Sequence, residues 1–327
     1  MSTMDNKSLL ITGGTGSLGR ALISHILAET KIRRIAIYSR DELKQMQLKE
    51  YFKGDPRLRW FIGDIRDVDR LRRALHGVDL VIHAAALKQV DTGEYNPMEF
   101  IKTNVLGSQN VIESCIDAGV KKIVALSTDK ASSPINLYGA TKLTADKLFI
   151  AANNYSSSYG TSFSVVRYGN VMGSRGSVIP FFQRLARENQ PLPLTDLRMT
   201  RFWISIKQAV TFVMDSLDIM NGGELYVPRI PSMKLIDLAR AVDSESKIIE
   251  VGMRPGEKLH EEMISADDSR RTLILQDRFV VQPVIAEWGF VPPKGIQMPE
   301  GIAYKSDTNE LWMTQNDIVE FLKTIAE

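Results

Sequence analysis

Several features are scarce in this sequence, and each scarcity excludes a class of protein. The 327 residues include one cysteine, Cys115, so no intramolecular disulfide can form and a reducing, cytoplasmic setting is expected. Every apolar run falls short of the roughly 18 residues that cross a membrane. The polar N-terminus lacks the pattern of a signal peptide. We therefore predict a protein with no membrane partner, in which Cys115 is a buried apolar residue.

An excess of charge of one sign is also lacking. Lys and Arg number 41 and Asp and Glu number 39, so the net charge gives no reason to expect a nucleic acid as partner. With 44% apolar and 24% charged residues, the chain is expected to fold rather than to be disordered. Histidines are few, and their spacing with the cysteine fits no metal-ligand pattern, so no metal site is predicted: His25, His76, His83 and His260.

What the sequence does have is a regular alternation of short apolar runs with helical patterns, which is typical of a parallel sheet. The predicted strands are Ser8–Thr12, Arg34–Tyr38, Leu58–Ile62, Leu80–His83, Lys122–Ser127 and Ser162–Arg167. The predicted helices are Leu18–Glu29, Asp41–Tyr51, Asp67–Leu75, Asn96–Ala118, Tyr138–Asn153, Val178–Glu188 and Ile206–Met220. This pattern predicts an α/β fold with a doubly wound parallel Rossmann sheet and a smaller C-terminal α/β lobe.

The two halves of the chain are expected to divide the binding functions. Residues 1–169 are predicted to form the cofactor-binding Rossmann domain, and residues 170–327 to form mainly the substrate-binding lobe. Some segments of the second half are expected to return to the first domain.

A glycine-rich turn follows the first predicted strand. Gly13, Gly16 and Gly19 are spaced three apart and open a helix, which is the context that dinucleotide binding requires. Glycine allows close backbone approach, so the free N–H groups of the helix start can face a pyrophosphate. A purely structural glycine turn is the alternative. The residues expected to contact the cofactor here are Gly13, Thr15, Gly16, Ser17, Leu18 and Gly19.

The end of the second predicted strand favours NADP over NAD. An NAD site usually has an acid there to bind the ribose hydroxyls, whereas this chain has Ser39 and Arg40. Together with Lys44, these side chains suit a 2′-phosphate through charge-assisted hydrogen bonds. Asp41 leaves an alternative open, because it could be the ribose acid; its position before a helical pattern also suits a helix N-cap.

Two further segments are expected to line the cofactor. Asp64 and Ile65 follow the third strand, where a carboxylate can accept from an adenine amino group and an apolar side chain can cover the ring. Three small residues, Ala84, Ala85 and Ala86, follow the fourth strand and would let a cofactor lie against backbone. Ordinary tight packing explains the alanines equally well.

Proton-handling side chains crowd the segment after the fifth strand. Thr128, Asp129 and Lys130 emerge at the carboxyl end of that strand, where a parallel sheet opens to its ligands. Tyr138 and Lys142 are four residues apart, so they share one face of the next helix. A nearby ammonium favours the phenolate, which makes Tyr138 a candidate general base. The alternatives are a structural ion pair and ordinary helix positions.

The glycine turn and the Tyr138–Lys142 segment together resemble the extended short-chain dehydrogenase/reductase superfamily. Within it, the chain is similar to the inverting UDP-N-acetylglucosamine 4,6-dehydratases, which supply a 4-keto sugar for pseudaminic acid synthesis. The similar segments are distributed along nearly the whole chain: residues 39–45, 84–90, 127–131, 136–142, 199–202 and 254–258. One departure lies at residues 90–94, where the family's Val-Pro-x-Cys-Glu reads Val-Asp-Thr-Gly-Glu. This loop is expected to touch the sugar or a neighbouring subunit.

The resemblance implies a role for each proton-handling residue. Tyr138, helped by Thr128 and Lys142, takes the proton of the sugar's 4-hydroxyl while hydride leaves carbon 4 for NADP. Lys130 then removes the carbon-5 proton, and Asp129 protonates the departing 6-hydroxyl. The hydride returns at carbon 6 and carbon 5 is inverted, so NADP is recycled without net redox change. Lys130 must be neutral to act, and we expect desolvation and nearby cations to lower its pKa.

The implied substrate is a UDP-sugar. Arg201 and Arg254 suit its diphosphate, because arginine binds phosphate oxygens bidentately. Asn170 and Glu257 are expected to make polar contacts, and Lys88 to contact cofactor or sugar. The family also implies a homo-oligomer, specifically a hexamer. Two other interpretations stay open: a UDP-sugar 4-epimerase or simple oxidoreductase, and a non-catalytic NADP-sensing regulator.

Overall fold

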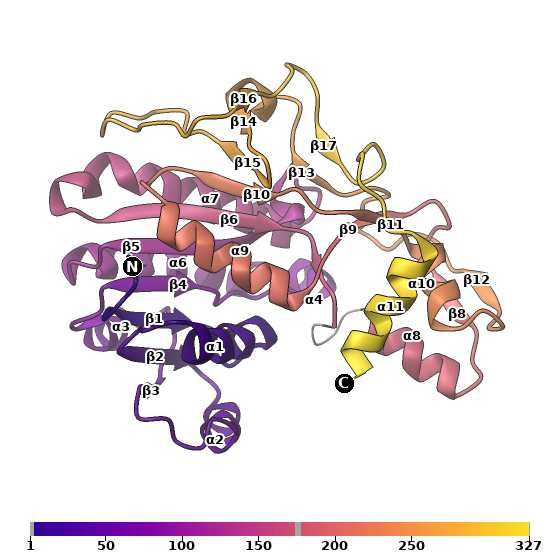
Figure 1. The fold of residues 1–327 in the computed structure, drawn as a ribbon, viewed down its shortest axis with the longest axis horizontal. Helices are drawn as coiled ribbons and strands as arrows, with labels where there is room; N and C mark the ends of the chain where they lie inside the picture. The colour runs from indigo at the N-terminus through magenta and orange to yellow at the C-terminus, as the bar shows by residue number, and fades with distance from the viewer. Residues whose placement is uncertain (1–2, 174–177, 327) are drawn as a thin grey trace.

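The computed structural model describes residues 3–173 and 178–326, and its main feature is a ten-stranded sheet (Figure 1). The strand order is β16-β14-β15-β10-β6-β5-β4-β1-β2-β3, with parallel neighbours from β10 to β3 and an antiparallel extension at the other edge. The strands are β1 (Ser8–Thr12), β2 (Arg34–Ser39), β3 (Leu58–Ile62), β4 (Leu80–His83), β5 (Lys122–Thr128), β6 (Ser162–Tyr168), β10 (Leu225–Pro228), β14 (Thr272–Ile274), β15 (Arg278–Val281) and β16 (Ile296–Gln297). The order 3-2-1-4-5-6 within it is that of a doubly wound nucleotide-binding sheet, which confirms the predicted fold class.

Helices cover both faces of the sheet. On one face α1 packs beside α9, and on the other α3, α6 and α7 lie side by side (Figure 1). All five residues of the central strand β1 are buried, which explains its unbroken apolar run. The helices of this part are α1 (Ser17–Glu29), α2 (Glu42–Tyr51), α3 (Val68–Leu75), α4 (Val90–Tyr95), α5 (Pro97–Phe100), α6 (Gly107–Asp117), α7 (Leu137–Ser156) and α9 (Ile206–Ile219), with the helical turns η1 (Ile101–Leu106), η2 (Asp129–Ala131) and η3 (Ser157–Tyr159).

A smaller lobe stands beside the main sheet and carries the C-terminus (Figure 1). Its own core includes Phe182, Leu238 and Ile318, which are almost fully buried. The lobe is built from α8 (Val178–Arg187), β8 (Leu192–Leu194), α10 (Leu235–Val242), β12 (Ile248–Glu250) and α11 (Gln315–Ala326). The remaining elements of this half are β7 (Asn170–Val171), β9 (Thr200–Ile204), β11 (Ser232–Lys234), β13 (Glu262–Ile264), η4 (Asp268–Arg271) and β17 (Tyr304–Lys305). The second half of the chain thus contributes both the lobe and four strands of the main sheet.

One predicted helix is divided in the structure. The sequence predicts a single helix over residues 96–118, whereas the structure has α5, the π-helical turn η1 and α6 there. A π-turn adds a residue to the helix and changes where side chains point. Asn104, inside η1, uses this to bond the backbone of Leu87 at 2.8 and 2.9 Å and the hydroxyl of Thr141 at 3.0 Å. The irregular turn therefore joins the segment after β4 to α7.

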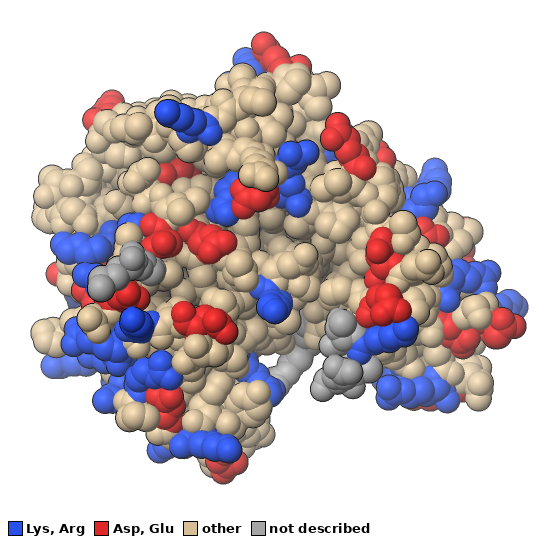
Figure 2. Space-filling view, viewed as in Figure 1, with Lys and Arg blue, Asp and Glu red and all other residues tan. Residues whose placement is uncertain are grey.

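The surface of this face carries both signs of charge, interspersed, with a hollow between the main body and the smaller lobe (Figure 2). Among the described residues, no helix combines the length and apolarity that a membrane crossing requires. The hollow is where the carboxyl ends of the parallel strands face the lobe.

Candidate active site

One cleft of about 1450 Å³ runs along the carboxyl edge of the parallel strands, with α8 and β8 on its far side. Of the predicted site residues, Asp129 is buried and does not line the cleft. The others all do: Gly13, Thr15, Gly16, Ser17, Leu18, Gly19, Ser39, Arg40, Lys44, Asp64, Ile65, Ala84, Ala85, Ala86, Lys88, Thr128, Lys130, Tyr138, Lys142, Asn170, Arg201, Arg254 and Glu257. The fold therefore gathers residues from both halves of the chain around a single space.

The three glycines of the first turn each meet a different steric demand. Gly13 has a φ of 67°, and a Cβ there would come within 2.8 Å of the Ala85 nitrogen. A Cβ on Gly19 would overlap the backbone of Gly14, so this glycine lets the helix pack against the turn. At Gly16 the nearest atom to such a Cβ is the Gly13 oxygen at 3.4 Å, which leaves space open above the start of α1. This geometry fits a pyrophosphate lying against the turn.

Cations and acids alternate at the end of β2. Arg40 is half exposed, with a guanidinium nitrogen 3.7 Å from Asp64. Asp41 caps α2, because its carboxylate accepts the backbone N–H of Lys44 at 2.9 Å and also pairs with the Lys44 ammonium. The N-cap alternative for Asp41 is thus confirmed. Ser39 is buried, and its hydroxyl accepts a hydrogen bond from Gln45 at 2.9 Å.

The adenine-side and alanine segments are tightly held by the chain itself. Asp64 accepts two hydrogen bonds from the Arg66 guanidinium, at 2.8 and 3.0 Å, and Ile65 is buried in the main core. Behind the alanines, the Thr12 hydroxyl accepts the N–H groups of Ala84 and Ala85, each at 3.2 Å. Both segments line the cleft, and hydrogen bonds to Arg66 and Thr12 hold them in place.

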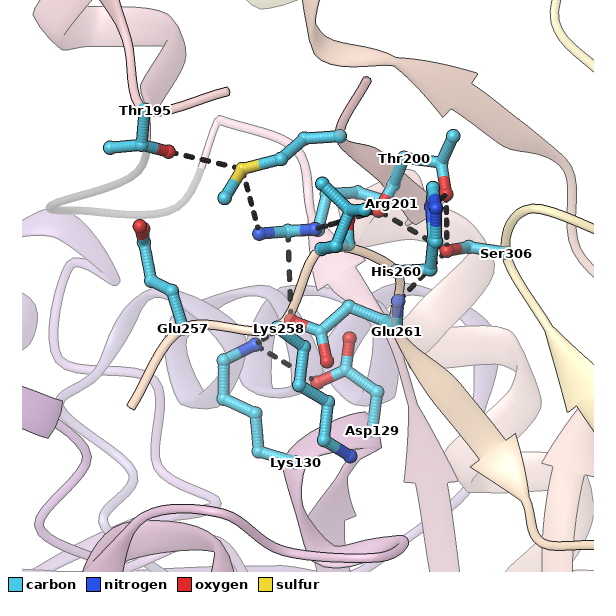
Figure 3. Close-up of polar contacts among 12 residues, drawn as sticks. Asp129, Lys130, Thr195, Thr200, Arg201, Glu257, Lys258, His260, Glu261 and Ser306 are labelled. Atoms are coloured by element: carbon cyan, nitrogen blue, oxygen red, sulfur yellow. Dashed lines mark hydrogen bonds and ion pairs between the residues drawn. The ribbon is translucent and has the colours of Figure 1, made fainter. Parts of the chain in front are cut away.

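The turn η2 presents the acid and the amine together. Thr128, the last residue of β5, caps η2 and donates its hydroxyl to the Asp129 carboxylate at 2.9 Å. The Lys130 ammonium donates to the same carboxylate oxygen at 3.2 Å and, on its other side, to Glu261 at 3.1 Å (Figure 3). The second oxygens of Asp129 and Glu261 are buried, and no described residue forms a hydrogen bond with either.

Arg201 completes this cluster from the opposite side. Its guanidinium lies 3.6 Å from the Glu261 oxygen that Lys130 contacts (Figure 3). Its remaining contacts are with the carbonyls of Thr200 and Leu259, at 2.7 and 3.0 Å, and with the sulfur of Met199. The side chain is 8% exposed, so the guanidinium is mainly engaged with the protein.

The site shifts the pKa values of the two buried carboxyl groups, Asp129 and Glu261, in opposite directions. Burial raises the pKa of Asp129, and the negative charge of Glu261 raises it further, against the opposing effect of Lys130. Burial also acts on Glu261, but Lys130 and Arg201 together outweigh it and lower the pKa of Glu261. When the pKa values of two interacting carboxyl groups shift in opposite directions, one group keeps its proton and can act as an acid, while the other stays ionised. Asp129 is therefore suited to carry a proton.

The expected depression of the Lys130 pKa is wrong for this arrangement. Burial lowers the pKa of Lys130, but Asp129 and Glu261 outweigh burial and raise it above its ordinary value. Sequence reasoning missed Glu261, which supplies the second carboxylate. It lies 131 residues from Lys130 in the chain, and no spacing or composition pattern connects the two.

Tyr138 stands in the first turn of α7, whose start is held at two points. The N-cap Asn136 accepts the N–H of Gly139 at 2.7 Å, and Glu94 of α4 accepts the N–H of Leu137 at 2.7 Å. Glu94 lies in residues 90–94, where the sequence differs from the family pattern but keeps its glutamate. This segment, which forms most of α4, therefore helps to position α7 and Tyr138. Burial raises the pKa of Tyr138 to about 12, opposed chiefly by the charge of Lys130 and by a hydrogen bond with Thr128.

Lys142, one turn further along α7, is almost fully buried. Its ammonium donates to the carbonyl of Leu126 at 2.7 Å, which fixes it under the end of β5. Burial lowers the pKa of Lys142, and the nearby Asp146 opposes this effect. Sequence reasoning also missed Asn104, whose contacts with Leu87 and Thr141 tie this helix to the cofactor side of the cleft.

The remaining predicted substrate residues lie at the outer part of the cleft. Arg254 is exposed, and its backbone forms a turn with Glu257, whose carboxylate accepts the Arg254 N–H at 3.1 Å. Asn170 begins β7 and is partly exposed, and Lys88 is exposed. Within residues 3–173 and 178–326, no group of three or more His, Cys, Asp or Glu side chains is arranged to hold a metal ion.

A Rossmann sheet with a glycine turn, beside a tyrosine and a lysine four residues apart on one helix, defines the class of extended short-chain dehydrogenases/reductases. Within that class, residues 9–283 match the family model described as polysaccharide biosynthesis protein, so the chain belongs to this family.

Named relatives and solved structures narrow the similarity. The chain is 50% identical over 327 residues to the inverting UDP-N-acetylglucosamine 4,6-dehydratase of Campylobacter jejuni, covering 97% of this chain and 98% of that protein. It is 42% identical over 281 residues to a UDP-glucose 4-epimerase of Rickettsia massiliae, covering 84% of this chain and 82% of that protein. The resemblance to the inverting dehydratases that the motifs indicate is thereby confirmed.

Two solved structures share the fold. Pen from Bacillus thuringiensis matches with a TM-score of 0.89 and 37% identity, over 98% of this chain and 99% of that one. The dTDP-glucose 4,6-dehydratase DesIV of Streptomyces venezuelae, solved with NAD bound, matches with a TM-score of 0.69 and 26% identity, over 77% of this chain and 86% of that one.

Proposed function

We propose that this protein is a sugar-nucleotide 4,6-dehydratase that removes water from UDP-N-acetylglucosamine and gives the 4-keto-6-deoxy sugar with inversion at carbon 5. The observation that carries the proposal is the η2 turn, which places the Lys130 amine in the same cleft as Thr128 and Tyr138, with the buried acid Asp129 in contact with both Thr128 and Lys130. An epimerase needs only to move a hydride and one proton at carbon 4. The pair Asp129 and Lys130 is what water loss additionally requires.

The chain's own residues divide the proton transfers. Tyr138, hydrogen-bonded with Thr128, is placed to take the 4-hydroxyl proton. Once carbon 4 is a ketone, the proton on carbon 5 becomes acidic, and Lys130 takes it when its amine is neutral. Asp129, whose proton is retained by burial and by Glu261, gives that proton to the departing 6-hydroxyl. The 6-hydroxyl therefore leaves as water with the Asp129 proton, and the product is completed when a proton is returned to carbon 5 and the hydride to carbon 6. Over the whole cycle the sugar loses the 4-hydroxyl proton and the 6-hydroxyl, which is one water.

The cofactor we propose is NADP, retained between turnovers. When bound, it accepts the hydride from carbon 4 and returns it at carbon 6. The glycine turn fits its pyrophosphate, because the space above Gly16 is open while Gly13 and Gly19 are sterically required. Arg40 and Lys44 suit a 2′-phosphate, and the carboxylate of Asp41 is already engaged as the cap of α2 and in an ion pair with Lys44.

The nucleotide end of the substrate would lie under the smaller lobe. Arg254 is an exposed cation there and suits the diphosphate, with Glu257 and Asn170 as polar contacts for hydroxyl groups. Arg201, committed to Glu261, would act on the sugar side instead. We therefore propose that residues 1–169 bind mainly the cofactor and residues 170–327 mainly the substrate; the hexamer stays a prediction.

The test is incubation of the purified protein with UDP-N-acetylglucosamine without added cofactor. Mass spectrometry is expected to show loss of one water, and proton NMR a methyl group at carbon 6 and an inverted carbon 5. An unchanged mass with a new axial 4-hydroxyl would assign the protein to the 4-epimerases, the alternative that the Rickettsia relative suggests. No turnover with any UDP-hexose would contradict both assignments.

A further inference from the structure

Behind the cleft, the described residues contain a buried group of charges that the proposed mechanism uses only in part. Lys130 and Asp129 belong to the mechanism, whereas Glu261 and Arg201 have no step of their own. Glu261 is 2% exposed, and it reaches the cluster from the residue just before β13, a strand that packs against η2 (Figure 3). A carboxylate buried to this extent needs a partner, and its partners here are the mechanistic amine and an arginine.

We infer that Glu261 is a positioning residue for water loss: it holds the Lys130 amine beside Asp129, keeps the proton on Asp129, and is itself held by Arg201. This inference rests on the proposed dehydration. It gives the buried arginine a function as well, since Arg201 fixes the carboxylate that faces the amine.

The geometry supports the positioning part. The Lys130 nitrogen lies 3.1 Å from Glu261 and 3.2 Å from Asp129, so two oxygens fix the end of a flexible side chain. Lysine loses considerable rotamer freedom when it is fixed, and the lost freedom must be offset by contacts of this kind. Without Glu261 the amine would have one protein acceptor among the described contacts, and its nitrogen could swing away from carbon 5.

The charge of Glu261 supports the second part. Two carboxylates beside one another cannot both be ionised without cost, and the one with fewer cations keeps its proton. Glu261 is stabilised as an anion by Lys130 and Arg201, and more weakly by Lys258, so the proton resides on Asp129. The unpartnered second oxygen of Asp129 is the atom that could hold this proton.

The neighbouring glutamate supplies a matched control. Glu262 accepts hydrogen bonds from the hydroxyls of Ser132 and Ser133, at 2.8 and 2.6 Å, and lies 3.9 Å from Lys305. It holds the same loop but not the amine. In Glu262→Gln the acceptor oxygen remains, so the loop is retained while one negative charge next to Glu261 is lost.

The test compares the pH dependence of kcat in the wild type, Glu261→Gln, Glu261→Asp and Glu262→Gln, each as the cofactor-loaded protein with UDP-N-acetylglucosamine. The charged groups around the amine are Asp129, Glu261, Arg201 and Lys258, with Tyr138 beside them. Removing the charge of Glu261 lowers the pKa of Lys130 and the pKa of Asp129. Both limbs of the pH profile of kcat belong to this interacting pair, so both move to lower pH.

Glu261→Gln is therefore expected to shift both limbs to lower pH and to reduce kcat by about 10- to 100-fold, the usual cost of a misplaced catalytic group. Glu261→Asp keeps the charge, so its limbs stay in place while kcat falls. The two limbs of the pH profile of Glu262→Gln are expected to lie at the same pH as those of the wild type, even if the maximal kcat of this variant differs. Reduced nicotinamide should accumulate at 340 nm in Glu261→Gln, because the described contacts of Glu261 are with Lys130, Arg201 and Ser306 and not with Tyr138 or Thr128, which act at carbon 4.

The outcomes separate the inference from the proposed function. A wild type that releases no water from the sugar overturns both. A wild type that dehydrates, beside a Glu261→Gln variant with unshifted limbs and no accumulated reduced nicotinamide, overturns the inference alone. A variant that fails to fold is recognised by circular dichroism, and Glu261→Asp then decides: wild-type kcat in that variant would also contradict the positioning role.

Discussion

Lys130 is the single side chain on which the proposed dehydration depends most directly. Lys130→Ala is expected to abolish both water loss and exchange of the carbon-5 proton in deuterated water, because no other described amine contacts Asp129. The cofactor should remain bound, since the glycine turn is untouched. Proton NMR of the sugar and absorbance of the bound cofactor measure these two outcomes.

Lys258 provides the control for that experiment. Its ammonium lies in the same neighbourhood but donates to the carbonyl of Ser132 at 2.6 Å and does not line the cleft. Lys258→Ala should retain measurable carbon-5 exchange. If Lys130→Ala also exchanges the carbon-5 proton, the base is another group.

Arg40 is the residue on which the proposed preference for NADP over NAD depends. Arg40→Ala is expected to weaken NADP binding by roughly 10- to 100-fold, the range for a lost hydrogen bond between charged groups, while NAD binding stays near its original value. Isothermal titration with each cofactor checks this, with Arg72→Ala as control, because Arg72 is an exposed arginine paired with Asp117. Equal weakening of both cofactors would contradict the 2′-phosphate assignment.

In the turn between β1 and α1, one glycine is expected to matter for cofactor binding and another for stability. In Gly16→Ala the new Cβ meets only ordinary contact, so the unfolding midpoint should change little while cofactor affinity falls. In Gly19→Ala the Cβ overlaps the Gly14 backbone, so stability should fall by about 1–3 kcal/mol, as overpacked sites do. Thermal unfolding without added cofactor and a cofactor titration measure the two effects; wild-type affinity in Gly16→Ala would refute the phosphate role of the turn.

The same scale shows what the sequence can and cannot predict. β1 and β4 have their predicted bounds, because short apolar runs mark buried parallel strands. The short helix α4 was not foreseen, since six residues with an internal glycine show no helical period. The π-turn η1 was not predicted either, because the contacts of Asn104 that accompany it are with two segments distant in the sequence. Glu261 belongs to the same group, as only the folded chain brings it to Lys130.

For the whole molecule, the main consequence of the topology is that the two halves cannot be separated at residue 169. Strand β10 pairs with β6 through Leu225 and Val165, and α9 covers α1 on one face of the sheet. A fragment of residues 1–169 would expose both contacts to water. We expect it to be insoluble or only partly folded and to bind no NADP, as measured by circular dichroism and titration; native-like binding by this fragment would contradict the single folding unit.

The lone thiol has a practical consequence at this scale. Cys115 is fully buried within α6, and burial raises its pKa, so the native molecule offers no reactive sulfur among its described residues. A cysteine engineered onto the rim of the smaller lobe and another onto the outer end of α2 would be the only sites that a fluorophore could reach. The distance between the lobe and the sheet during turnover could then be followed by energy transfer, without first removing any natural residue.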